Sequence, residues 1–329
     1  MLEHGGNLRA ASSQYGFALD QWLDLSAGLN PHWYPPPAIA AQAWHRLPEA
    51  DPELLQAAQA YYGAPAMLAV AGTQAAIQAL PALRPPSRIV VAAPSYAEHA
   101  HHWSRHGHTL REVPYALLPQ AVAHCDVLVV CNPNNPTGAR VPPSDLLTWA
   151  AELGRRGGWL VVDEAFADTA PDLSVAAHSQ MPGLIVLRSI GKFFGLAGVR
   201  VGFVAAQEAL LTALADALGP WTISGPAQQI CMAALLDLRW QAETRQRLIA
   251  QGARLHALLS AHGIEAAGTP LFQWWAQTRA TDFHRHMAGR AIWVRLFGGA
   301  ARGIRLGLPP DEDGWRRLGA ALRDWNRQS

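Results

Sequence analysis

The sequence has almost no lysine: of its 26 lysine and arginine residues, only Lys192 is a lysine. Arginine keeps its charge, whereas a lysine amine can lose its proton and form a Schiff base with an aldehyde. Lys192 is therefore a candidate for imine chemistry. The alternative is a compositional bias that replaced lysine by arginine and left one lysine at an arbitrary position.

Cysteine, net charge and long apolar runs are also scarce. The three cysteines, Cys125, Cys131 and Cys231, form no CxxC motif and no even-numbered secreted framework. The net charge of +1 favours neither nucleic acid nor an anionic membrane. Apolar runs such as 127–131 are too short to span a bilayer, and the amino terminus lacks a basic and apolar signal region. We therefore predict a reduced, cytoplasmic protein without nucleic-acid or membrane partners.

The composition, with 50% apolar and 16% charged residues, is typical of a compact globular enzyme. From about residue 66 to 206, short β-rich runs alternate with helical stretches. This pattern predicts an α/β fold with a mostly parallel sheet, whose ligands bind beyond the carboxyl ends of the strands. The predicted strands are 88–92, 126–131, 159–163, 184–188 and 199–204.

Two helical patterns flank these strands. Residues 142–156 predict a helix with Ser144 as N-cap, ending at Gly157 and Gly158. A longer helical pattern covers about 227–262, and short strands at 272–276, 292–296 and 303–308 follow it.

The sequence therefore predicts three segments. Residues 1–37 form an amino-terminal arm that belongs to the small domain and the active-site lid. Residues 38–225 form the large cofactor-binding domain, and residues 226–329 form a small α+β domain.

A glycine-rich turn between two predicted strands carries Ser189, Lys192 and Arg200. A hydroxyl and a guanidinium can hold a phosphate dianion while glycines let the backbone approach it. A second turn leads into a helix whose first amides would point at an anion, although small-residue turns of this kind are common. These amides belong to Gly72, Thr73 and Gln74.

Polar residues also end two other predicted strands. Asp163 and Glu164 are adjacent, so they point to opposite faces of their strand and only one can face a given pocket. Asn135, in Asn132-Pro-Asn-Asn-Pro-Thr-Gly, is presented rigidly between two prolines. Taken by itself, this motif slightly favours an ordinary Asx/Pro turn.

Together these motifs resemble the aminotransferase class I/II family of pyridoxal-phosphate enzymes of fold type I, and the resemblance covers nearly the whole chain. It implies that pyridoxal 5'-phosphate forms a Schiff base with Lys192, and that Asp163 pairs with the pyridinium nitrogen. A carboxylate there keeps the ring protonated, so that it accepts electrons. It further implies that Asn135 donates to the ring's 3′ oxygen. The implied phosphate ligands are Ser189, Arg200 and the amides of Gly72, Thr73 and Gln74.

The segment Pro94-Ser-Tyr-Ala-Glu-His resembles the part of these enzymes that stacks an aromatic side chain on the cofactor. Tyr96 is the predicted stacking residue and His99 a neighbour of Asp163, although ordinary core packing would also explain Tyr96. Further histidines, at positions 101, 102, 106 and 108, lack cysteine or carboxylate partners at ligand spacing. We predict no metal.

Two residues depart from the family pattern. Phe166 stands where many relatives place a tyrosine that reaches the 3′ oxygen of the cofactor. Leu47 stands where relatives often have a tyrosine that contacts the neighbouring subunit's cofactor. The resemblance still implies a homodimer with its active site near the interface, without these two contacts.

Two further segments concern the substrate. Arg305, in Gly303-Ile-Arg-Leu-Gly-Leu, resembles the family arginine that binds the substrate α-carboxylate, unless it forms a surface salt bridge. His4-Gly-Gly-Asn, with Asp24-Leu-Ser-Ala-Gly-Leu-Asn-Pro behind it, resembles the threonine-phosphate decarboxylases of cobalamin biosynthesis. The implied substrate-binding residues are His4, Gly5, Gly6, Asn7 and Arg295 on the phosphate, Asn30 nearby and Arg305 on the carboxylate.

The resulting hypothesis is decarboxylation of L-threonine O-3-phosphate to (R)-1-amino-2-propanol O-2-phosphate, with Lys192, Asp163 and Tyr96 as catalytic residues. The alternative is a histidinol-phosphate-type aminotransferase, because both reactions use the same lysine. A cofactor-binding regulator or inactive partner is a third possibility. Regulators of this lineage carry an added DNA-binding domain, and an inactive partner would be expected to lose Lys192 or Asp163.

Overall fold

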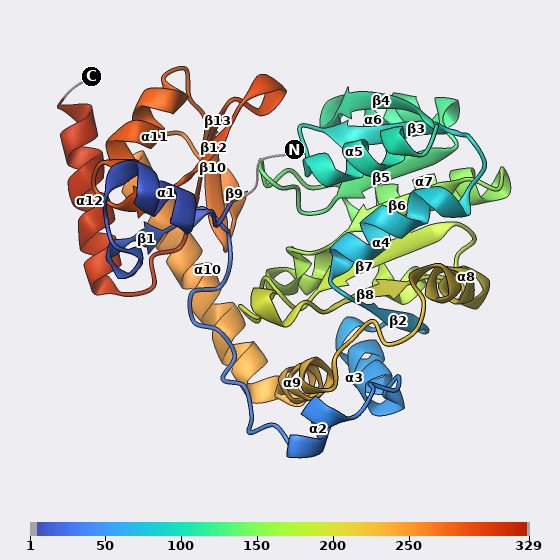
Figure 1. Cartoon of the computed structure of the whole chain (residues 1–329). Helices are drawn as coiled ribbons and strands as arrows, with labels where there is room; N and C mark the ends of the chain where they lie inside the picture. Colours follow the sequence, from blue (N-terminus) through green and yellow to red (C-terminus); the bar gives the residue numbers. More distant parts are fainter. Residues whose placement is uncertain (1–4, 328–329) are drawn as a thin grey trace. The chain divides into compact units, whose positions relative to one another are not determined.

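The computed structural model describes residues 5–327, and their contacts divide the chain into two compact units (Figure 1). The larger unit consists of Trp33–Asn135 and Ala139–Glu243. The smaller unit consists of the described parts of Met1–His32, Pro136–Gly138 and Thr244–Ser329. The domain boundaries predicted after residues 37 and 225 stay a prediction.

The larger unit contains a seven-stranded sheet in the order β2-β8-β7-β6-β5-β3-β4. All neighbouring strands are parallel except β8, which is antiparallel to both β2 and β7. The prediction of a mostly parallel sheet is therefore confirmed. The strands are β2 (Met67–Val70), β3 (Arg88–Ala93), β4 (Thr109–Pro114), β5 (Val127–Cys131), β6 (Trp159–Asp163), β7 (Leu184–Ser189) and β8 (Gly202–Ala205).

One hydrophobic core of this unit lies between one face of the sheet and three helices, α4 (Thr73–Ala79), α5 (Ala97–Arg105) and α8 (Glu208–Leu218). Alternate strand residues such as Val129 and Ile185 pack against Ile77, Trp103 and Leu214. Burying an aliphatic side chain of this size contributes about 1.5–3 kcal/mol. Asp163 ends β6 two residues after Val161, a member of this core, so strand alternation places both on the same face.

Two helix predictions differ from the structure. Helix α7 spans Pro143–Arg155 and its N-cap is Pro142, so the prediction of Ser144 as N-cap was wrong. Pro143 takes the first helical position, which suits proline because the amide hydrogen that it lacks would have no intrahelical partner there. The long pattern at 227–262 forms two helices, α9 (Gly225–Leu236) and α10 (Leu238–Ser260). Asp237 separates them, and its carboxylate accepts a hydrogen bond from the Trp240 amide at 3.0 Å.

The smaller unit combines a four-stranded antiparallel sheet, in the order β12-β13-β10-β9, with the parallel pair β1–β11. Its strands are β1 (Leu23–Asp24), β9 (Ala267–Thr269), β10 (Phe272–Ala276), β11 (Ile292–Trp293), β12 (Arg295–Phe297) and β13 (Gly303–Gly307). The remaining α-helices are α1 (Leu8–Tyr15), α11 (Ala280–Ala288) and α12 (Glu312–Asn326) in this unit, and α2 (Ala41–His45), α3 (Pro52–Tyr62) and α6 (Leu118–Ala121) in the larger one. Among residues 5–327, none of the helices has the length and hydropathy needed to span a membrane.

Candidate active site

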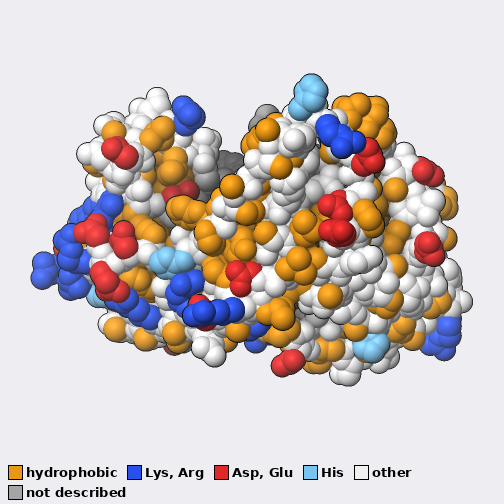
Figure 2. Space-filling model, turned by 90° about the horizontal axis from the view of Figure 1, so that it is seen from below, with side chains coloured by type: hydrophobic (Ala, Val, Ile, Leu, Met, Phe, Trp, Pro, Cys, Tyr) orange, Lys and Arg blue, Asp and Glu red, His pale blue; other side chains and the backbone are white. Residues whose placement is uncertain are grey.

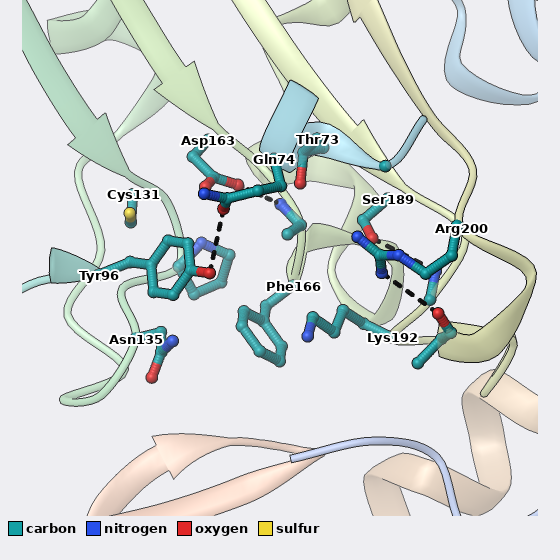
Figure 3. A pocket seen from close by; sticks show the side chains of 15 residues that line it. Thr73, Gln74, Tyr96, Cys131, Asn135, Asp163, Phe166, Ser189, Lys192 and Arg200 are labelled. Carbon is teal, nitrogen blue, oxygen red and sulfur yellow. Dashed lines mark hydrogen bonds between the residues drawn. The ribbon is translucent and has the colours of Figure 1, made fainter. Parts of the chain in front are cut away.

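A pocket of about 130 Å³ lies in the larger unit, where the carboxyl ends of β5, β6 and β7 meet the start of α4 (Figure 3). This is the edge of a parallel sheet at which ligands bind. Every residue predicted to contact the cofactor lines this pocket: Gly72, Thr73, Gln74, Tyr96, Asn135, Asp163, Ser189, Lys192 and Arg200.

Lys192 stands in the turn that follows β7. The next two residues, Phe193 and Phe194, are fully buried and pack edge to face against each other, and the Phe194 ring stacks on Trp240. This aromatic packing anchors the turn. The Lys192 amine lies 5.4 Å from the ring centroid of Phe166, inside the pocket. An amine held at one place beside an apolar ring is suited to covalent chemistry with an aldehyde.

One side of the pocket is suited to bind a phosphate group. Gly72 has φ +71°, and a Cβ there would lie 2.6 Å from a guanidinium nitrogen of Arg200. A Cβ on Gly202 would lie 2.6 Å from the Thr73 amide nitrogen. Glycine at position 72 therefore lets the Arg200 guanidinium lie against the turn before α4. Glycine at position 202 lets β8 lie against the first amide of α4. With the Ser189 hydroxyl, the guanidinium and the first amides of α4 form a donor set suited to a phosphate dianion.

On another side of the pocket, Asp163 is held by two hydrogen bonds. Its Oδ1 accepts from the Ala165 amide at 3.0 Å, and its Oδ2 lies 2.9 Å from Nε2 of His99. Burial lowers the pKa of His99, but hydrogen bonding to Asp163 and Cys131 outweighs it and raises the pKa to about 10. His99 is thus protonated at neutral pH. The same contact orients the Asp163 carboxylate at the edge of the pocket.

His99, Cys131 and Asp163 also have donor atoms within 4.8 Å of one another, close enough for a metal ion. The hydrogen bond between His99 and Asp163 explains why these two side chains lie close together without a metal ion. The predicted absence of a metal stays a prediction.

Glu164 points away from the pocket, as the strand alternation predicts. Its Oε2 lies 2.7 Å from Nη1 of Arg188, and Nη2 of the same guanidinium lies 3.2 Å from Oδ1 of Asp168. The Glu164 carboxylate also accepts hydrogen bonds from the Ser174 hydroxyl and the Val175 amide. Burial raises the pKa of Glu164, opposed by the Arg188 charge. This buried cluster ties β6 to β7, the two strands that carry Asp163 and Ser189.

The predicted carboxylate and phosphate ligands Arg305 and Arg295 lie in the smaller unit, opposite each other in the register of β12 and β13. The Arg305 guanidinium is buried over the Phe272 ring and donates to the Ser26 carbonyl at 2.5 Å. Burial and the charge of Arg295 lower the pKa of Arg305 to about 9, despite an opposing effect of Asp24. Burial is the larger of the two causes, and an anion bound beside Arg305 and Arg295 would oppose both of them.

The amino-terminal arm is fixed onto the segment around Ser26. The Gly6 amide donates to Oγ of Ser26 at 2.8 Å, and that hydroxyl donates to Asp24 at 2.7 Å. A Cβ on Gly5 would lie 2.7 Å from the Ser26 carbonyl, so the contact requires glycine. Asn7 is exposed just before α1. His4, which was also predicted to bind the substrate phosphate, lies outside the described residues.

Asn30, the remaining predicted substrate residue, is 2% exposed. Its side-chain oxygen accepts a hydrogen bond from the His32 amide at 2.9 Å. The role predicted for Asn30 on the substrate side stays a prediction.

The family model for aminotransferase class I and II matches residues 20–299. The chain belongs to this family. It is 52% identical to threonine-phosphate decarboxylase from Pseudomonas aeruginosa over 98% of the chain and 97% of the relative. It is 41% identical to threonine-phosphate decarboxylase from Sinorhizobium, over 98% of the chain and 97% of that relative. The family predicted from the sequence is confirmed.

Solved structures support the fold. Histidinol-phosphate aminotransferase from Sinorhizobium meliloti, in complex with pyridoxal-5'-phosphate, superposes with a TM-score of 0.83 at 23% identity, covering 97% of this chain and 94% of that one. L-threonine-O-3-phosphate decarboxylase from Porphyromonas gingivalis gives a TM-score of 0.73 at 20% identity, with 87% and 92% covered. The predicted fold class is therefore confirmed.

Within this aminotransferase-family pocket, sequence reasoning missed several lining residues. Phe166 was predicted only as a departure from the family pattern, yet its buried ring lines the pocket. Each missed residue lies within four positions of a predicted one, so extending each motif by four residues would have found them. The others are Cys131, Pro133, Ala165, Gly191 and Ala197.

Proposed function

We propose that this protein is a pyridoxal-phosphate-dependent threonine-phosphate decarboxylase that converts L-threonine O-3-phosphate to (R)-1-amino-2-propanol O-2-phosphate and carbon dioxide. The observation that carries the proposal is its 52% and 41% identity, over nearly the full length, to threonine-phosphate decarboxylases. Aminotransferase relatives are more distant: the histidinol-phosphate aminotransferase of Yersinia enterocolitica is 32% identical over 64% of the chain. Transamination is therefore the second candidate.

The residues of the larger unit fit the cofactor. Lys192 would hold it covalently and Asp163 would pair with its ring nitrogen, while Asn135 would donate to its 3′ oxygen. Ser189, Arg200 and the first amides of α4 would bind its phosphate. When bound, pyridoxal phosphate accepts the electron pair released when a bond to the substrate's α-carbon breaks.

The protein's own groups have three tasks in this reaction. Asp163, oriented by His99 and the Ala165 amide, would stabilise a positive charge on the ring nitrogen. Arg305 binds the substrate carboxylate as a two-pronged donor, and Arg295 with Gly5, Gly6, Asn7 and His4 binds the substrate phosphate. The bond between Cα and the carboxylate carbon breaks, and carbon dioxide leaves. The Lys192 ammonium then supplies the proton that Cα gains.

A homodimer is part of the proposal. Exposed large hydrophobic side chains are found in the larger unit, and in the view of Figure 2 hydrophobic side chains lie among polar and charged ones over much of the surface. Exposed apolar side chains favour a protein partner where they adjoin one another, and Trp44 on α2 and Leu236 on α9 belong to helices that contact each other. The exposed large hydrophobic residues of the larger unit include Trp33, Trp44, Leu47, Trp221, Leu236 and Leu238.

A cytoplasmic location is supported by three buried free cysteines. The place of the reaction in cobalamin biosynthesis stays a prediction.

Product analysis in D₂O tests the proposed function. The cofactor-loaded protein, given L-threonine O-3-phosphate, should yield an aminopropanol phosphate with one deuteron on the carbon that lost its carboxylate. An aminotransferase would instead yield the oxo product and leave the cofactor as its amine. Lys192→Ala should remove both the reaction and the yellow absorbance of the bound cofactor while the far-UV circular dichroism stays unchanged. Formation of the oxo product alone would contradict decarboxylation.

A further inference from the structure

A chain of polar side chains extends from the pocket through Tyr96. The Tyr96 hydroxyl donates to Oε1 of Gln74 at 3.2 Å, which Figure 3 shows as a dashed line. Nε2 of Gln74 in turn donates to Oε2 of Glu98 at 2.7 Å. Nε2 of His102 lies 3.0 Å from the same Glu98 oxygen. Two helices supply this chain, because Gln74 is near the start of α4 whereas Glu98 and His102 are one turn apart on α5.

The chemistry of the partners fixes the direction of the hydrogen bond between Gln74 and Glu98. An amide NH₂ group only donates, so Oε2 of Glu98 accepts from Gln74, and a ring N–H at Nε2 of His102 can donate to the same oxygen. With its NH₂ group engaged by Glu98, Gln74 presents its carbonyl oxygen to the Tyr96 hydroxyl. Burial, followed by the charges of Glu98 and Asp163, raises the pKa of Tyr96 well above its ordinary value. Tyr96 therefore stays protonated and remains the donor.

Burial makes this arrangement costly to disrupt. Glu98 is 8% exposed, and a buried carboxylate requires hydrogen-bond donors to offset its lost hydration. Removing Glu98 would free the Gln74 amide to rotate, and the acceptor for Tyr96 would no longer be fixed. The contacts thus couple the orientation of a pocket-lining ring to a carboxylate outside the pocket lining.

We propose that Gln74, Glu98 and His102 are positioning residues that set the angle at which the Tyr96 ring meets the cofactor. This inference rests on the proposed function, because it takes Tyr96 as the residue that stacks on the cofactor ring. The side chain of Gln74 acts on Tyr96, and only its backbone amide serves the phosphate site. Supporting hydrogen bonds of this kind hold a functional side chain in one conformation.

The test compares wild type with Glu98→Gln, which keeps the shape of the side chain but removes its charge. We expect the dissociation constant of pyridoxal phosphate, measured by titrating the apoprotein, to rise by about tenfold, the effect of losing one charged hydrogen bond. The visible circular dichroism of the bound cofactor should weaken as the ring loosens. His102→Gln, which keeps a donor, should change both readouts less than His102→Leu. Glu152→Gln, on the surface of α7, is the matched control and should match wild type.

A double-mutant cycle decides whether the effect passes through the Tyr96 hydroxyl. Tyr96→Phe should by itself raise the dissociation constant, and Glu98→Gln should add nothing in that background. If wild type, Glu98→Gln and Tyr96→Phe had the same cofactor affinity and dichroism, this inference would be wrong while the proposed function would stand. Additive effects of the two substitutions would have the same consequence. If Glu98→Gln does not fold, a Tyr96→Phe variant identical to wild type still overturns it. A wild-type apoprotein that binds no pyridoxal phosphate would overturn the proposed function and this inference together.

Discussion

Nε2 of His99 lies 2.9 Å from Oδ2 of Asp163, and both side chains are buried. The contact joins α5 to the carboxyl end of β6. It fixes the orientation of a carboxylate that lines the pocket. A carboxylate held in one orientation is suited to pair with a protonated ring nitrogen.

This pair makes stability depend on pH. The pKa of His99 is raised from 6.5 to about 10, so its contribution to the free energy of unfolding is fully present below pH 6.5 and is lost as the pH rises through 10. His99→Gln can donate to Asp163 but does not titrate. Urea unfolding of the apoproteins from pH 6 to 10.5 should therefore show the wild type losing its advantage over this variant by more than about 1.4 kcal/mol. An advantage that is constant or grows with pH would contradict the assignment.

Gly202 controls the approach of α4 to the sheet. Its added Cβ would lie 2.6 Å from the Thr73 amide nitrogen, which is backbone and cannot move aside cheaply. Gly202→Ala should lower the free energy of unfolding by about 1–3 kcal/mol and weaken cofactor binding, because the first amides of α4 shift. Gly198→Ala is the matched control, since no atom lies within 4 Å of its added Cβ. Denaturant unfolding and cofactor titration of both variants check this, and equal behaviour would argue against the close approach.

Arg188 has a structural role that can be separated from binding. Its guanidinium contacts Glu164 at 2.7 Å and Asp168 at 3.2 Å, and all three residues are buried. Arg188→Met would leave two carboxylates without their cation, and should lower the free energy of unfolding by about 3–5 kcal/mol. Urea unfolding measures this directly. A loss below 1 kcal/mol, roughly the value of an exposed pair, would show that the cluster is not stabilising.

Arg305 should determine substrate affinity. Lysine keeps the charge but cannot form two parallel hydrogen bonds with a carboxylate. Arg305→Lys is therefore expected to raise KM by about ten- to a hundredfold, the range for losing a hydrogen bond to a charged group. The exposed Arg302, also in the smaller unit, provides the control variant Arg302→Lys. Steady-state kinetics measures KM for both variants, and circular dichroism checks that both are folded. Equal KM values for the two variants would contradict the role of Arg305.

The sequence supports prediction wherever one short motif carries the information. Continuous β-branched runs predicted the central strands, and the turns after them predicted the residues of the pocket, because parallel strands bring their carboxyl ends together. The cluster of Arg188 with Glu164 and Asp168 was not predictable, since it depends on β6 and β7 being neighbours. The same holds for the chain from Tyr96 to His102. The break at Asp237 was missed because the helical periodicity continues through it.

The most direct measurement is the amount of carbon dioxide released per L-threonine O-3-phosphate consumed by the cofactor-loaded protein, with and without an added oxo acid. The proposed decarboxylase should release one equivalent over many turnovers, and the oxo acid should make no difference. Turnover that requires the oxo acid and releases no carbon dioxide would contradict the proposal and identify an aminotransferase.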